Sequence, residues 1–99
     1  MSPIYLPVYI NVEKLLMKLD VSHDIKSLHD RWENGGRFVS IQAGGMVYSL
    51  FNHPTRRHWA KATSSFGFHS TETEKPGVWA VAKCCSGWFG GDKTCYGIL

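Results

Sequence analysis

Two adjacent glycines, Gly44 and Gly45, separate two segments that are rich in β-branched and aromatic residues, 37–43 (RFVSIQA) and 46–52 (MVYSLFN). Glycine readily adopts the positive φ angles that two-residue hairpin loops require, so a Gly-Gly pair between such segments is a strong hairpin signal. The sequence therefore predicts an antiparallel β-hairpin in the middle of the chain. The other elements have to be placed around this hairpin.

The segment 11–20 (NVEKLLMKLD) has a helical period instead. Val12, Leu15 and Leu19 recur at the spacing of one helix face, with Leu16 beside them, and Asn11 is a good N-cap residue. This pattern predicts a short helix. The preceding residues 4–10 (IYLPVYI) include Pro7, and because proline cannot donate to a β-ladder, they predict an edge strand or an extended arm.

Residues 22–36 (SHDIKSLHDRWENGG) repeat the helical pattern. Ser22 is the expected cap, while Ile25, Leu28 and Trp32 would form an apolar stripe. Gly35 stands where a helix commonly ends in a left-handed residue. We therefore expect a second short helix before the hairpin.

Strand patterns dominate the part of the chain that follows the hairpin. Residues 58–70 predict a third strand, with Trp59 and Lys61 on the face opposite to Ala60 and Ala62. Residues 71–77 read as a polar loop, 78–85 (VWAVAKCC) as a central strand, and 95–99 (CYGIL) as a last short strand. The predicted fold class is α+β, a single domain over 1–99 with two short N-terminal helices packed on a four- to five-stranded antiparallel meander sheet.

The composition is that of a globular protein, with 43% apolar and 19% charged residues among 99. No apolar run approaches the roughly 20 residues of a membrane-spanning helix. The first residues lack the basic segment of a signal peptide, and three cysteines fit no complete disulfide framework. These features predict a cytoplasmic protein with no membrane partner.

The net charge of +3 is unevenly distributed along the chain. Residues 35–69 carry four basic side chains and no carboxylate, and the stretch 52–61 (NHPTRRHWAK) combines two arginines and a lysine with a tryptophan. Basic groups contact phosphates, and an aromatic ring can stack on a base. We therefore expect a binding surface at this place, although the same stretch also fits a solvated turn with Trp59 in the core. The expected binding residues are Arg37, Arg56, Arg57, His58, Trp59 and Lys61.

The resulting functional hypothesis is a small non-catalytic regulator or inhibitor, of the kind that phages and mobile elements encode. It would bind nucleic acid or a nucleic-acid-handling protein through its basic, aromatic β-half, and its oligomeric state stays open. One alternative is a metal-independent ribonuclease that uses His53, His58 or His69 for acid–base catalysis. Another is a pure protein–protein inhibitor anchored by Trp88 and Phe89, two rings that could equally fold back onto the sheet.

No cofactor or metal site is expected. A zinc site needs four ligands, and the chain could supply them as a histidine with Cys84, Cys85 and Cys95. However, neighbouring cysteines on a strand point to opposite faces, and the sequence lacks the closely spaced cysteine pairs of zinc-binding motifs. The glycine-rich stretch 86–93 (SGWFGGDK) matches neither a phosphate-binding loop nor a dinucleotide fingerprint.

Overall fold

The computed structural model describes residues 3–21, 24–87 and 90–99. In these ranges one helix precedes seven strands: α1 (Val12–Leu19), β1 (Ile25–Glu33), β2 (Gly36–Ala43), β3 (Met46–Asn52), β4 (His58–Thr63), β5 (His69–Glu74), β6 (Ala80–Cys85) and β7 (Lys93–Ile98). The helix begins at its predicted N-cap, where the Asn11 side chain accepts a hydrogen bond of 2.8 Å from the backbone N–H of Glu13. The helix predicted for residues 11–20 is therefore confirmed.

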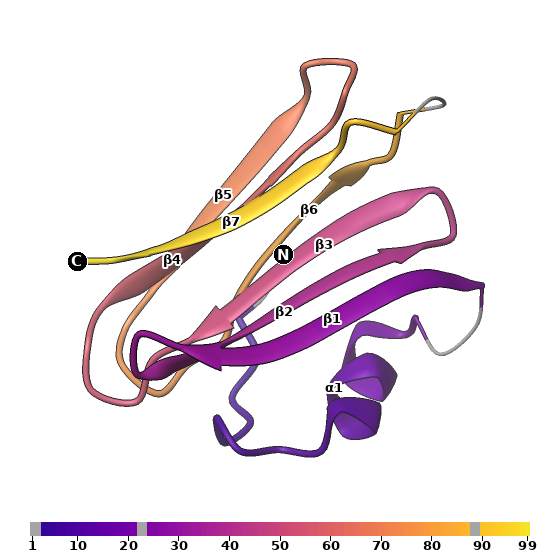
Figure 1. The fold of residues 1–99 in the computed structure, drawn as a ribbon. Coiled ribbons are helices and arrows are strands. Elements are labelled where there is room, and N and C mark those ends of the chain that lie inside the picture. The colour runs from indigo at the N-terminus through magenta and orange to yellow at the C-terminus, as the bar shows by residue number, and fades with distance from the viewer. Residues whose placement is uncertain (1–2, 22–23, 88–89) are drawn as a thin grey trace.

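The strands form two antiparallel sheets that lie face to face (Figure 1). The first has the order β1-β2-β3-β6, and the second has the order β5-β4-β7. The predicted hairpin is the β2–β3 pair, in which Ala43 lies opposite Met46 and the two glycines close the turn. After β3 the chain crosses to the second sheet, returns to the first as β6, and ends in the second as β7.

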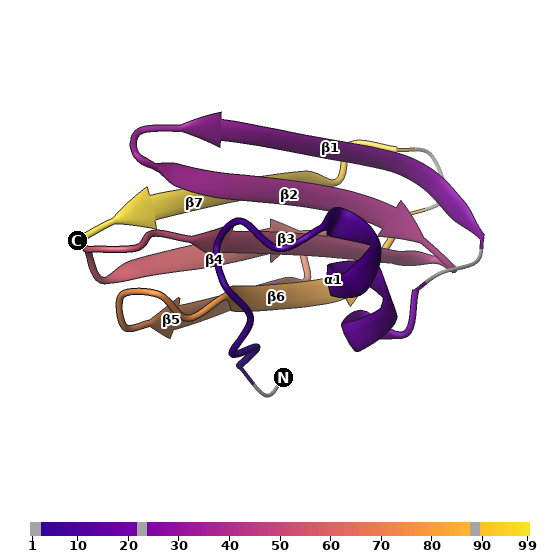
Figure 2. The ribbon, with the colours of Figure 1, turned by 90° about the horizontal axis from the view of Figure 1, so that it is seen from below.

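Two apolar layers hold the molecule together. One lies between the sheets, where Phe38 and Phe51 from the four-stranded sheet meet the alanines of β4 and the ring of Tyr96. The other lies on the opposite face of the four-stranded sheet, where α1 and the N-terminal arm cover Val39, Leu50 and Trp79 (Figure 2). Because β2 and β3 are covered on both faces, most of their residues are buried.

The fold class predicted from the sequence is wrong, mainly because residues 25–33 are a strand and not a second helix. The turn after β1 is Asn34-Gly35, with φ angles of 55° and 81°, and it sets Glu33 opposite Gly36. Asparagine followed by glycine is the preferred sequence of the tightest hairpin turns. The apolar stripe predicted for this helix does not form a buried face, since Ile25 and Trp32 are exposed.

Four further predictions need correction. Residues 71–74, predicted as part of a polar loop, belong to β5, and residues 58–70 are not one strand but β4, a turn and the start of β5. The strand β6 lies at the edge of its sheet rather than in the centre. The sheet is not a single meander, because the strands divide between two sheets. The arm at 4–10 makes one isolated bridge, between Ile4 and Trp79.

Candidate functional site

The outer face of the three-stranded sheet carries an accessible row of polar side chains. Along β4, His58, Ala60 and Ala62 are buried against the other sheet, while the alternate residues point outward. The strand register sets Thr73 and Gly97 beside Trp59, Thr71 and Cys95 beside Lys61, and His69 and Lys93 beside Thr63. We call these outward residues the lysine face: Trp59, Lys61, Thr63, His69, Thr71, Thr73, Lys93, Cys95 and Gly97.

The lysine face is positively charged. It carries Lys61 and Lys93, and none of its members is a carboxylic acid. Strand alternation places the two acids of β5, Glu72 and Glu74, on the opposite side of the sheet. The exposed Arg57 precedes β4 directly and adds a further cation at one end of the face. Such a surface attracts anions.

Trp59 belongs to this outer face and not to the core between the sheets. Its indole ring lies against the backbone of Gly97, where an added Cβ atom would be only 2.2 Å from Cε2 of the ring. Glycine at position 97 is what allows the ring to lie this close. Trp59 is therefore half-buried, with one surface of its ring on the sheet.

At the end of the face nearest Thr63, the chain makes a turn with two exposed phenylalanines. Phe66 is 54% exposed and Phe68 is 59% exposed. The turn is closed by a hydrogen bond of 2.7 Å from the Ser64 N–H to the Phe68 carbonyl and one of 2.9 Å from the Gly67 N–H to the Ser64 carbonyl. We call residues 64–68 the aromatic turn. It was missed in the sequence, although the pattern Ser-Ser-Phe-Gly-Phe has the serines and glycine of a turn.

The carboxylate of Asp92 fastens the aromatic turn to the loop between β6 and β7. Its Oδ1 accepts hydrogen bonds from the backbone N–H groups of Gly87 (2.9 Å) and Ser65 (3.0 Å), and its Oδ2 accepts from the Ser86 hydroxyl (2.9 Å) and the Gln42 amide (3.1 Å). These bonds, that of Gly87 first, hold the pKa of Asp92 below its ordinary value. The negative charge of Asp92 is therefore stabilised by hydrogen bonds within the fold.

The structure places the predicted binding residues in three different environments. Trp59 and Lys61 lie on the lysine face, and Arg57 is exposed beside it. The guanidinium group of Arg56 donates to the carbonyl oxygen of Leu99 from Nε (3.1 Å) and Nη2 (2.7 Å), which holds the last residue against the β3–β4 turn.

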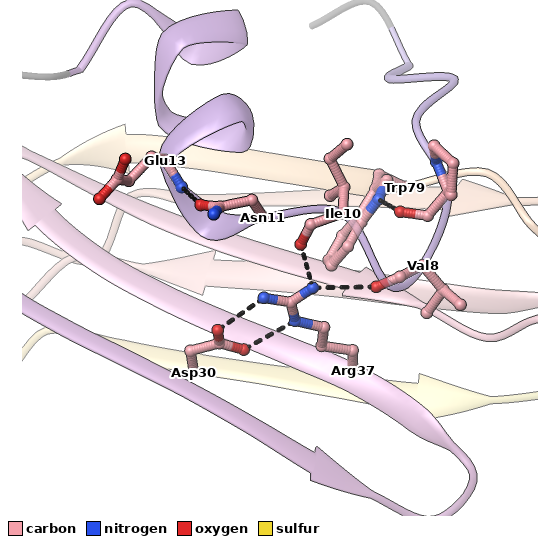
Figure 3. Close-up of polar contacts among 8 residues, drawn as sticks. Val8, Ile10, Asn11, Glu13, Asp30, Arg37 and Trp79 are labelled. Carbon is pink, nitrogen blue, oxygen red and sulfur yellow. Dashed lines mark hydrogen bonds and ion pairs between the residues drawn. The ribbon is translucent and has the colours of Figure 1, made fainter.

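Arg37 and His58 lie inside the fold. Arg37 is 6% exposed and forms a two-pronged ion pair with Asp30 on β1, with Nε–Oδ1 at 2.9 Å and Nη2–Oδ2 at 2.7 Å (Figure 3). Its third nitrogen donates to the carbonyl oxygens of Val8 and Ile10 in the arm. His58 is completely buried, with Nδ1 at 2.8 Å from the Arg56 carbonyl oxygen and Nε2 at 2.7 Å from that of Val78.

The histidines proposed for acid–base catalysis do not converge. His53 is buried, and its Nδ1 accepts hydrogen bonds from the backbone N–H groups of Arg56 (3.0 Å) and Thr55 (3.2 Å). His58 is enclosed between the sheets, whereas His69 lies at the other end of the β4–β5 hairpin on the outer face. In the described part of the chain, no group of three His, Cys, Asp or Glu side chains could hold a metal ion.

The three cysteines are free thiols in different environments. Cys84 is buried between the sheets, where desolvation raises its pKa, while Cys85 and Cys95 are exposed. Cys95 lies on the lysine face, and Cys85 lies on the α1 side of the four-stranded sheet. Trp88 and Phe89, the proposed anchors of a protein inhibitor, lie outside the described residues.

A shallow groove lies between β1–β2 and β7. It is lined by His29, Ser40 and Thr94, with Gln42 and Asp92 at one end. Its polar groups bond to one another, as in the contact of 2.8 Å between the Ser40 and Thr94 hydroxyls. The groove is therefore a polar seam that joins the two sheets. No helix in the described ranges is both long and apolar enough to cross a membrane.

Comparison with known proteins identifies one related family. The model of the family described as "Bacteriocin (Lactococcin_972)" matches residues 31–96. The match begins near the end of β1 and ends in β7, so it includes all of β2 to β6, the aromatic turn and all of the lysine face except Gly97. The searches of the curated proteins and of the solved structures give no match.

This match overturns the function predicted from the sequence. Bacteriocins are secreted antimicrobial proteins that act on target cells. The predictions of a nucleic-acid-binding regulator, of a nucleic-acid or nucleic-acid-processing partner without any membrane, and of a cytoplasmic location are therefore wrong. The cytoplasmic prediction depended on the lack of a recognisable signal peptide, and such a lack does not locate a protein. Because the match covers two thirds of the 99 residues, the chain belongs to the lactococcin 972 family of bacteriocins.

Proposed function

We propose that the protein is secreted and inhibits the growth of other bacteria by acting at their envelope. The observation that carries this proposal is the family match over residues 31–96. The matched residues include five complete strands from the two sheets, so the similarity extends well beyond one short motif.

The charge of the molecule supports an action at the envelope. Bacterial membranes present anionic lipids, which attract basic surfaces. The chain has a net charge of +3, and its lysine face combines two lysines with no carboxylate. Attraction of this kind would concentrate the protein on a target cell before any specific step.

The test is a growth assay with the purified protein on a panel of Gram-positive and Gram-negative bacteria. We expect the folded protein to slow growth or lower the viable count of some members of the panel. The matched control is the Arg37→Ala variant, which lacks the hydrogen bonds of a buried guanidinium group and should be less stable. If the folded protein inhibits no member of the panel at any soluble concentration, the proposal is wrong.

A further inference from the structure

We propose that the lysine face and the aromatic turn form one membrane-docking site, which binds the surface of a bilayer that contains anionic phospholipids. The proposal deepens the proposed function, because it names the residues and the lipid chemistry through which the protein would engage a target cell. It depends on the position of the two features, on their charge and on their exposure.

The two features are continuous. In the strand register, Thr63 is the last residue of β4 to be paired, with His69 on one side and Lys93 on the other. The aromatic turn begins at the next residue, Ser64. The phenylalanines therefore extend from the sheet end at which Lys93 and His69 lie, with Lys61 two residues further along β4.

This combination fits the interface of a bilayer. Aromatic and aliphatic side chains of interfacial proteins enter the boundary between headgroups and acyl chains, while neighbouring basic groups contact the phosphates. Phe66 and Phe68 are each more than half exposed, which is unusual for phenylalanine in a folded protein. Burial of both rings in lipid would remove this apolar surface from water.

The exposed rings favour a lipid surface over a soluble polyanion. A soluble polyanion without aromatic groups, such as polyphosphate, would pair with the lysines but would offer nothing apolar to the phenylalanines. The carboxylate at this end, Asp92, has both oxygens occupied by hydrogen bonds that hold the turn to the β6–β7 loop. The turn is thus held in place by the fold, so little conformational entropy is lost when the rings bind.

The test measures binding to vesicles of phosphatidylcholine alone or of equal parts of phosphatidylcholine and phosphatidylglycerol, by co-sedimentation. We expect binding to the anionic vesicles only, weakening as salt is added. Lys61→Gln and Lys93→Gln should each weaken partitioning about fivefold, and Phe66→Ala with Phe68→Ala should weaken it at least as much.

Matched controls come from the other side of the molecule. Lys14→Gln with Lys18→Gln removes two exposed lysines of α1, and Tyr5→Ala with Tyr9→Ala removes two exposed rings of the arm. Both double variants should bind anionic vesicles as the unchanged protein does. An equal loss in the lysine control would show unspecific attraction by net charge, and an equal loss in the tyrosine control would show unspecific binding through exposed rings. Either result would overturn the proposal.

The native cysteines supply a second readout without any substitution. Cys95 lies on the lysine face and Cys85 lies on the other sheet, and both thiols are exposed. Bound anionic vesicles should slow the alkylation of Cys95 by a water-soluble maleimide several-fold and leave that of Cys85 unchanged. Equal protection of both thiols, or protection of Cys85 alone, would mean that the membrane does not bind at the lysine face and would overturn the proposal.

The outcomes separate this inference from the proposed function. If the lysine and phenylalanine variants still inhibit growth but the protein binds no vesicle, the docking site is wrong and the antimicrobial function stands. If the protein binds anionic vesicles as expected but inhibits no bacterium, the docking site stands and the antimicrobial function is wrong. Binding to soluble polyphosphate that competes fully with vesicles and ignores the phenylalanine variants would overturn the lipid assignment.

Discussion

Two arginines on neighbouring strands show how strongly burial decides the value of an ion pair. Arg37 is buried, with 8% of its side chain exposed, while its partner Asp30 keeps 24% of its side chain exposed. The guanidinium group of Arg37 also lies against the rings of Trp32 and Trp79, with centroid distances of 5.7 Å and 5.9 Å. Arg31 pairs with Glu33 at 3.3 Å, but its side chain is 59% exposed. The surrounding water therefore screens the second pair more than the first.

We therefore predict that Arg37→Ala lowers the free energy of unfolding by about 1–3 kcal/mol, because Asp30 and two backbone carbonyls lose their donor. Arg31→Ala is the matched control and should change it by less than about 1 kcal/mol. Urea denaturation of both variants measures the difference. Similar losses in the two variants would mean that the Arg37 pair is no more valuable than a surface pair.

The carboxylate of Asp92 makes the end with the aromatic turn sensitive to acid. Its pKa is lowered in the folded state, chiefly by the backbone N–H groups of Gly87 and Ser65, so its ionised form stabilises the fold at pH values above the ordinary aspartate pKa. This stabilisation is lost as the pH falls through the lowered pKa.

We predict that Asp92→Asn is less stable than the unchanged protein at pH 7, and that the difference shrinks as the pH is lowered below about 4. Thermal unfolding of both proteins between pH 7 and pH 2 gives the comparison. A difference that stays constant over this range would show that the hydrogen bonds do not depend on the charge of Asp92.

At the scale of elements, a strand is easiest to predict from the sequence where a turn signal lies next to an apolar segment. The β2–β3 hairpin was predictable because Gly44-Gly45 lies between two buried segments. The strand β1 was not, because it is an exposed edge strand with few inward residues, so Ile25, Leu28 and Trp32 could be taken for a helix stripe. The turn signal Asn34-Gly35 was present, but it was interpreted as a helix end.

The start of β2 gives a prediction for this hairpin. A Cβ atom on Gly36 would lie 2.5 Å from Cζ of Phe51 and 2.8 Å from the carbonyl oxygen of Asn52, so an alanine there must push β2 away from β3. We expect Gly36→Ala to cost about 1–3 kcal/mol of unfolding free energy. The exposed strand residue Thr73 serves as control, since Thr73→Ala should change little. An equal effect of both substitutions in urea denaturation would contradict the close contact.

At the scale of the whole molecule, the sequence showed a region without carboxylates but not the surface that it forms. Arg37 was counted with this region, yet the fold buries its side chain and pairs it with Asp30 on β1. Lys93, by contrast, lies far along the chain and reaches the same face as Lys61 through the β4–β7 pairing. The pairing of distant strands decides which charges lie together. The bacteriocin family could not be inferred from charge, because attraction to anions is shared by many functions.

The N-terminal arm and α1 lie outside the family match, but they cover one face of the matched sheet. Removing residues 1–20 would expose Val39, Ile41, Leu50 and Trp79, a contiguous apolar face of the kind that drives association. We predict that the shortened chain self-associates in size-exclusion chromatography and binds a hydrophobic dye, whereas a full-length Met17→Ala variant, altered at an exposed helix position, does neither. If the shortened chain stays monomeric and binds no dye, the two sheets are soluble without the arm and α1. The packing of α1 on the sheet would then contribute little to the stability of the fold.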